Sequence, residues 1–214
     1  MSVIQNSVSN TIKNGTIRIF QMDVNMFFVG LFGALLFGAI ANILARYWIS
    51  RDAAVAITTA IAVLLLVAIF PERARISIIT AQMLLLGAAI GSTNFVVRYY
   101  GEKIHISYSG ILDCAFFFLN GAILAPIYEE VIMRRFMFAG ATRWIGGLMS
   151  AILVSSIFAL AHSNMMGYAF FFSLLLCLFT HIGISTFDRA VFHGAHNLVV
   201  QALYFFGGLH LGIR

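Results

Sequence analysis

Charged residues are scarce in this chain. Only 10% of its 214 residues are Asp, Glu, Lys or Arg, and 61% are hydrophobic. Soluble domains carry about 25% charged residues, so the composition excludes an ordinary soluble domain. Since a membrane-spanning helix takes about 20 apolar residues, the sequence predicts an all-α, polytopic transmembrane helical bundle. We expect about seven spans (six to eight), forming a single membrane domain over residues 1–214.

Cysteine and proline are also rare, with two of each. Cys114 and Cys177 lie far apart in apolar runs, which predicts small buried side chains and not a disulfide. Pro71 breaks the helix before a short polar turn. Pro126 predicts a bend within an apolar run, close to two acidic residues.

The net charge of +5 comes from basic residues that are scattered through short connections. This arrangement predicts contacts with the lipid bilayer and gives no indication of nucleic-acid binding. With seven spans and the N-terminus inside, eight Lys or Arg residues face the cytoplasm and five face the other side. The eight are Lys13, Arg18, Arg73, Arg75, Arg134, Arg135, Arg143 and Arg189. The positive-inside rule therefore favours a cytoplasmic N-terminus, in an inner or plasma membrane.

Seven apolar runs are the predicted spans. They cover residues 24–49, 53–70, 76–97, 110–138, 144–162, 168–184 and 190–206. The longest polar connection, residues 99–109, predicts a solvent-exposed loop.

Glu129 and Glu130 lie inside the fourth apolar run. A carboxylate at membrane depth is costly unless it has a partner, a water-filled cavity or a proton. Arg134 follows Glu130 by four residues, so the two share a helical face and predict a structural ion pair. Glu129 points about 100° away on a helix of ~3.6 residues per turn. This leaves Glu129 available for chemistry, with a snorkelling interfacial acid as the alternative.

Two further polar pairs have the same four-residue spacing. Phe158 and His162 end the fifth predicted span, and His193 and Asn197 lie early in the seventh. Polar faces of spans normally turn inward, so the three faces are expected to meet in one buried pocket. There, a carboxylate beside a histidine can take a proton from water. A second histidine and an asparagine can stabilise the oxyanion of an attacked carbonyl, or can simply join helices by hydrogen bonds.

The sequences EEVIMR, FALAH and HGAHN resemble, in order, the E-E-x-x-x-R, F-x-x-x-H and H-x-x-x-N/B motifs of the CPBP (Abi) membrane proteins. That family includes type II CAAX prenyl endopeptidases and bacteriocin-processing or bacteriocin-immunity proteins. The resemblance covers residues 110–206, which it identifies as a catalytic half.

The resemblance implies a metal-independent, glutamate-dependent intramembrane protease with no cofactor. It implies that Glu129 activates water with help from His162, and that His193 and Asn197 stabilise the oxyanion. Glu130, Arg134 and Phe158 would support the site. The substrate would be a peptide or protein at the membrane, either of CAAX type or a leader peptide. His181 and His196 leave open whether a further histidine takes part.

Other functions remain open from the residues alone. Glu and His side chains are also zinc ligands, but the H-E-x-x-H helix of zinc proteases is absent. A proton-coupled transporter would use the same groups as a relay, although no internal repeat is visible. A non-catalytic scaffold or immunity protein of the same family is the third alternative. The G-x-S-x-G motif of serine hydrolases is absent.

Overall fold

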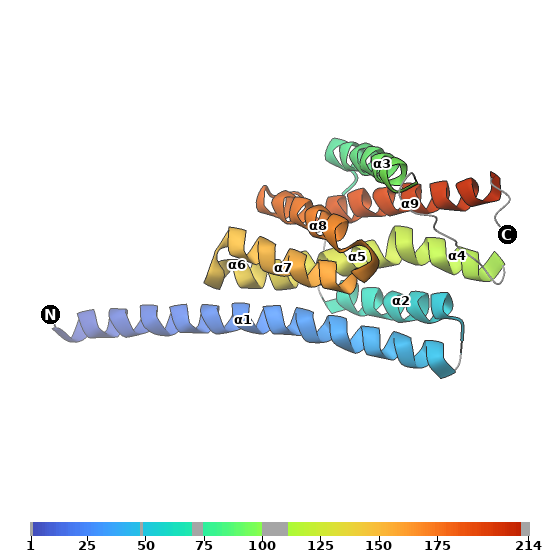
Figure 1. Cartoon of the computed structure of the whole chain (residues 1–214). Coiled ribbons are helices and arrows are strands. Elements are labelled where there is room, and N and C mark those ends of the chain that lie inside the picture. Colours follow the sequence, from blue (N-terminus) through green and yellow to red (C-terminus); the bar gives the residue numbers. More distant parts are fainter. Residues whose placement is uncertain (1, 48, 70–74, 100–110, 211–214) are drawn as a thin grey trace. The chain divides into compact units, whose positions relative to one another are not determined.

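The computed structural model describes residues 2–47, 49–69, 75–99 and 111–210 (Figure 1). Pro71 and nearly all of the predicted 99–109 loop lie outside these residues. Within the described ranges every regular element is a helix, which confirms the all-α prediction. Each of the seven predicted apolar runs is helical over most of its described residues, with exceptions near run ends and at Gly146.

The helices are α1 (Ser2–Tyr47), α2 (Arg51–Ile69), α3 (Ile78–Tyr99), α4 (Ile111–Leu119), α5 (Ala125–Glu129), α6 (Ala139–Ile145), α7 (Gly147–Ala161), α8 (Met166–His181) and α9 (Thr186–His210). Two π-helical segments, η1 (Asn120–Leu124) and η2 (Glu130–Phe138), join α4 to α5 and α5 to α6. A 3₁₀ turn, η3 (Ser163–Met165), precedes α8. The backbone is thus helical without a break from Ile111 to Ile145.

Among the residues that the structure describes, three helical stretches are long and apolar enough to cross a membrane: Val24–Tyr47, Arg51–Ala68 and Ile111–Ile145. Three shorter apolar helices cover Ile78–Asn94, Gly147–Ala161 and Met166–His181. Large apolar side chains such as Phe32, Leu64 and Leu85 are more than half exposed. In a lipid environment such side chains contact acyl chains, which fits the predicted membrane bundle.

The chain forms two compact units, each built from two separate stretches. The first unit contains residues 1–34 and 132–182, and the second contains residues 35–131 and 183–214. The prediction of a single membrane domain stays a prediction.

In the first unit, α7 packs against α8 (Figure 1). Val154 of α7 and Leu176 of α8 are fully buried. The N-terminal helix contributes Phe27, whose ring meets that of Trp144 edge to face with 5.7 Å between centroids. Gly30 lets this helix approach η2, because a Cβ at Gly30 would lie 2.8 Å from Cγ of Met137.

In the second unit, α3 lies along α9 (Figure 1). The two backbones approach closely at Gly91, where a Cβ would lie 2.7 Å from the carbonyl oxygen of His196. Small residues permit such approach between membrane helices. Near the start of α9, Asp188 accepts hydrogen bonds from Thr80 of α3 (2.5 Å) and from Ser185 (2.6 Å). The N-terminal end of α9 is thereby fixed to α3.

A polar stripe on α9 faces the α4–η1–α5 stretch. Arg189, His193, Asn197 and Gln201 follow one another at four-residue intervals, which places them on one helical face. Arg189 donates to Glu130. Asn197 donates to the Gly121 carbonyl, and Gln201 donates to the Phe117 carbonyl. This stripe sets which side of α9 turns toward the acidic residues.

Candidate functional site

Glu129 and Glu130 meet His193 of α9 in the second unit. Nε2 of His193 lies 3.6 Å from Oε2 of Glu129, and Nδ1 of His193 lies 3.5 Å from Oε1 of Glu130. One imidazole therefore lies between two carboxylates. A histidine in this position can hold a proton between the acids or present one to a reacting group.

Arg189 completes this group, which we term the acidic cluster (Glu129, Glu130, Arg189 and His193). Its Nε donates to Oε2 of Glu130 at 3.0 Å, and both side chains are buried. Arg189 also donates to the carbonyl of Ile184 and, at 3.3 Å, to the hydroxyl of Thr186. The guanidinium thus compensates one of the two carboxylate charges.

The two glutamates differ in their access to the surroundings. The side chain of Glu129 is 20% exposed, whereas that of Glu130 is completely buried. Glu130 is enclosed by Arg189 and His193. Glu129 can reach water or a substrate, as a reacting group must.

The backbone at the pair is π-helical. Glu130 begins η2, which continues for nine residues to Phe138. π-Helical turns are rare and occur frequently at functional sites. The prediction that Glu130 and Arg134 share a helical face assumes an α-helix, whereas both residues lie in this π-helical segment.

Arg134 makes its own set of contacts in the first unit. Its Nη2 donates to the Ser173 hydroxyl at 2.9 Å, and its guanidinium carbon lies 5.0 Å from the centre of the Phe158 ring. In the same unit, the rings of Phe158 and His162 stack with 4.3 Å between centroids. We term Arg134, Phe158, His162 and Ser173 the stacked cluster. An ion pair between Glu130 and Arg134 stays a prediction.

His162 is oriented from two sides. It follows the last residue of α7, and its Nδ1 lies 2.8 Å from the carbonyl oxygen of Phe158. That contact fits a proton on Nδ1, which leaves Nε2 to accept one. The prediction that His162 assists Glu129 stays a prediction.

Asn197 lies in the second unit, on the polar stripe of α9. Its Nδ2 donates to the Gly121 carbonyl at 2.9 Å. In η1 the amide of Ala125 bonds to the carbonyl of Asn120, five residues earlier. The next bond of that register would need an N–H at position 126, and Pro126 has none. Asn197 therefore supplies a donor that the proline withholds.

The two additional histidines have separate surroundings. His196 lies 3.0 Å from Oδ1 of Asn197 through Nδ1, and its Nε2 lies 3.4 Å from the amide of Asn94 on α3. It thus orients Asn197 and faces α3. His181 is exposed at the end of α8 in the first unit.

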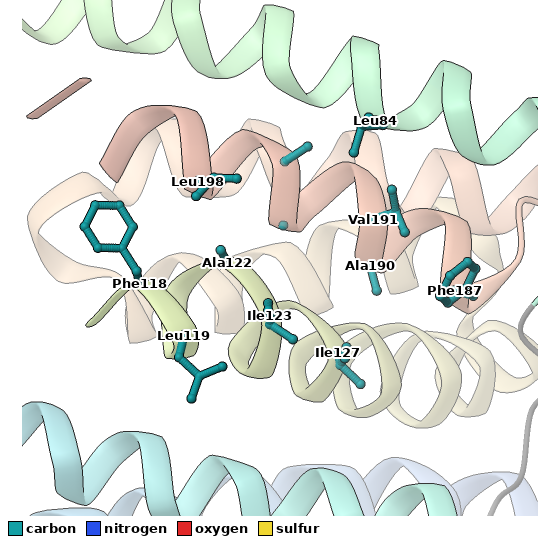
Figure 2. Close-up of a pocket in the computed structure, with 12 residues that line it drawn as sticks. Leu84, Phe118, Leu119, Ala122, Ile123, Ile127, Phe187, Ala190, Val191 and Leu198 are labelled. Carbon is teal, nitrogen blue, oxygen red and sulfur yellow. The ribbon is translucent and has the colours of Figure 1, made fainter. Parts of the chain in front are cut away.

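An apolar cavity of about 480 Å³ lies between α9 and the α4–η1–α5 stretch (Figure 2). Its walls come from α9, from the α4–η1–α5 stretch and from Leu84 of α3. The lining residues also include Phe118, Ile123, Ile127, Ala190, Val191, Gly194 and Leu198. Gly194 lets α9 approach η1 closely beside the cavity, because a Cβ there would clash with the Ala122 carbonyl. The cavity suits an apolar group.

Sequence reasoning missed Arg189. It was counted as a cytoplasmic loop charge, yet its exposed fraction is 3%, and that of Arg134 is 0%. Removing these two from the eight predicted cytoplasmic charges leaves six against five. The cytoplasmic position of the N-terminus stays a prediction with less support. The available signal was the four-residue step from Arg189 to His193.

No group of three or more His, Cys, Asp or Glu side chains is arranged to hold a metal ion within the part of the chain searched. Glu130 instead has a guanidinium against one of its oxygens.

Residues 111–212 match the family described as Rce1-like, type II CAAX prenyl endopeptidase Rce1-like. The match begins at α4 and includes all three motifs, and it confirms the resemblance that they predicted. Neither a curated protein nor a solved structure matches the chain.

The match to a CAAX protease family model and the apolar helices together indicate an integral membrane protein. The family supports intramembrane proteolysis in general terms.

Proposed function

We propose that this protein is an intramembrane endopeptidase that hydrolyses a peptide bond with water activated by Glu129. The observation that carries the proposal is the partly exposed Glu129 carboxylate, 3.6 Å from the buried His193 imidazole. A base must reach its water, and an electrophilic group must stay oriented. These two side chains meet both requirements.

The proposed reaction needs no covalent enzyme intermediate. Glu129, assisted by His162, takes a proton from water while the water oxygen attacks the carbonyl carbon of the peptide bond. His193 and Asn197 donate to the resulting oxyanion. The carbon–nitrogen bond then breaks, and Glu129 returns the proton to the leaving amine.

Asn197 has a second amide hydrogen for the oxyanion. One hydrogen of Nδ2 is directed to the Gly121 carbonyl, and Oδ1 faces His196. An amide nitrogen carries two hydrogens, so these contacts leave one donor. The contacts also hold the amide in a fixed orientation, as an effective oxyanion donor requires.

The substrate we propose is a membrane-associated peptide or protein with an apolar group next to the cleaved bond. The apolar cavity supports this choice, because its lining offers contact area and few polar groups. A CAAX-type substrate with a prenyl group and a leader peptide with apolar side chains both meet this description.

The test is cleavage of quenched peptides, prenylated and unprenylated, by purified protein in detergent. We expect cleavage that persists with a zinc chelator and is lost in Glu129→Ala. Loss of cleavage on chelation, restored by added zinc, would establish the metal alternative. A folded wild-type protein that cleaves neither kind of peptide would contradict the proposal and favour a scaffold or immunity protein.

A further inference from the structure

Arg189 stands outside the three motifs, yet it contacts a motif residue directly. Its Nε lies 3.0 Å from Oε2 of Glu130, and the other oxygen of Glu130 lies 3.5 Å from Nδ1 of His193. The carboxylate of Glu130 therefore connects Arg189 to His193. We propose that Arg189 is a positioning residue, which sets the orientation of the His193 ring through Glu130.

The charges explain how this connection works. A buried carboxylate is costly without a partner, and a guanidinium at hydrogen-bond distance stabilises its ionised form. The ionised Oε1 of Glu130 lies 3.5 Å from Nδ1 of His193 and attracts that side of the ring. With Nδ1 so engaged, Nε2 is directed to Glu129, 3.6 Å away. The contact at one ring nitrogen thus fixes the direction in which the other points.

Arg189 is itself held in place, so it can serve as a fixed point. It donates to the Ile184 carbonyl and the Thr186 hydroxyl, both at the start of α9. The adjacent Asp188 binds Thr80 of α3 and Ser185. This places a rigid end of α9 behind the Glu130 carboxylate.

The expected effect of Arg189 on cleavage rests on the proposed function, whereas its effect on the His193 ring does not. The structural measurement is nitrogen NMR of the full-length protein in detergent, labelled with ¹⁵N-histidine. The His193 signal is identified by its loss in His193→Gln. In Arg189→Met we expect a change in the His193 ring-nitrogen shifts, because Glu130 loses its charge partner.

Two variants control this measurement. Arg143→Met makes the same chemical change at an exposed arginine, and it should leave the His193 signal unchanged. In Glu130→Gln/Arg189→Met both charges of the pair are absent. That double variant should regain thermal stability relative to Arg189→Met, because the carboxylate that Arg189 compensates is then absent as well. It also provides a folded protein if the single variant does not fold.

The kinetic measurement is a separation of kcat from KM on the peptide that the wild type cleaves. We expect Arg189→Met to lower kcat by about tenfold or more, as for other groups that orient a reactive side chain, with KM little changed. Arg189→Lys keeps the charge, and its kcat should lie between those of the wild type and Arg189→Met. An unchanged His193 signal in folded Arg189→Met would overturn the inference. If the wild type cleaves nothing, the proposed function fails while the NMR result still decides the role of Arg189.

Discussion

The acidic cluster and the stacked cluster stabilise buried charge in different ways. In the acidic cluster, one imidazole lies between two carboxylates and a guanidinium pairs with one of them, at distances from 3.0 to 3.6 Å. In the stacked cluster, the Arg134 guanidinium lies over an aromatic ring and donates to a hydroxyl. The first arrangement concentrates titratable groups. The second fixes the orientation of one histidine ring.

This difference changes the interpretation of the first motif. Glu130 and Arg134 are four residues apart, yet their described contacts belong to different clusters in different units. The motif therefore supplies one residue to hold His193 and another to hold Phe158. The predicted ion pair between Glu130 and Arg134 stays a prediction beside these contacts.

The largest effect is expected at Glu129. Glu129→Gln keeps the shape of the side chain and removes the base, so cleavage should fall by about 10²- to 10⁴-fold. The melting temperature should change little, because the carboxylate is partly exposed. Peptide cleavage and thermal unfolding check both parts. A variant that retains most of its activity would remove Glu129 from the chemistry.

Substitution of Glu130 should lower stability more than activity, the reverse of Glu129. Glu130→Gln leaves the buried Arg189 without its carboxylate, and breaking a buried pair costs about 3–5 kcal/mol. Thermal unfolding in detergent measures this loss. Activity per folded molecule should exceed that of Glu129→Gln. Equal stability of the two single variants would abolish the distinction between these glutamates.

Phe158 tests the stacked cluster. Phe158→Leu removes the ring between Arg134 and His162, with a cation–π contribution of about 1–2 kcal/mol in addition to lost packing. We expect lower stability and a change in the ¹⁵N-histidine signal of His162. Arg134→Lys provides the comparison, since it keeps the charge but loses the planar contact. An unchanged His162 signal in Phe158→Leu would show that the ring is only a packing residue.

The smallest effects compare two amides on the polar stripe of α9. Asn197→Leu leaves the Gly121 carbonyl without the donor that Pro126 cannot supply, at a cost of about 1–3 kcal/mol. Gln201→Leu removes the 3.2 Å bond to the Phe117 carbonyl and should cost about 1 kcal/mol. Denaturation of both variants in the same detergent gives the comparison. A larger loss for Gln201→Leu would contradict the role assigned to the proline.

Much of this arrangement could be predicted from the sequence, because few charges in an apolar chain leave few choices. The seven apolar runs predicted the helices. Glu129 does lie 3.6 Å from His193, and the meeting of all three polar faces in one pocket stays a prediction. The roles of these residues stay predictions. Arg189 was missed because an arginine near the start of a span resembles a loop charge. Its burial depends on Glu130, which is 59 residues away in sequence.

The π-helical segments could not be predicted from periodicity. A four-residue spacing such as that of Glu130 and Arg134 fits an α-helical face, and nothing in it signals a five-residue hydrogen-bond register. Pro126 did indicate an irregular backbone before the acids. It could not indicate that Asn197 would donate to the Gly121 carbonyl, because that contact depends on how closely α9 packs at Gly194.

The central claim is that Glu129 activates water that attacks the peptide bond directly. Single-turnover cleavage in H₂¹⁸O, with mass analysis of the new carboxyl terminus, tests it most directly. We predict one ¹⁸O atom in the product of the first turnover and none in the Glu129 side chain. A first-turnover product that carries only ¹⁶O, with ¹⁸O later recovered in Glu129, would mean covalent catalysis and would contradict the account.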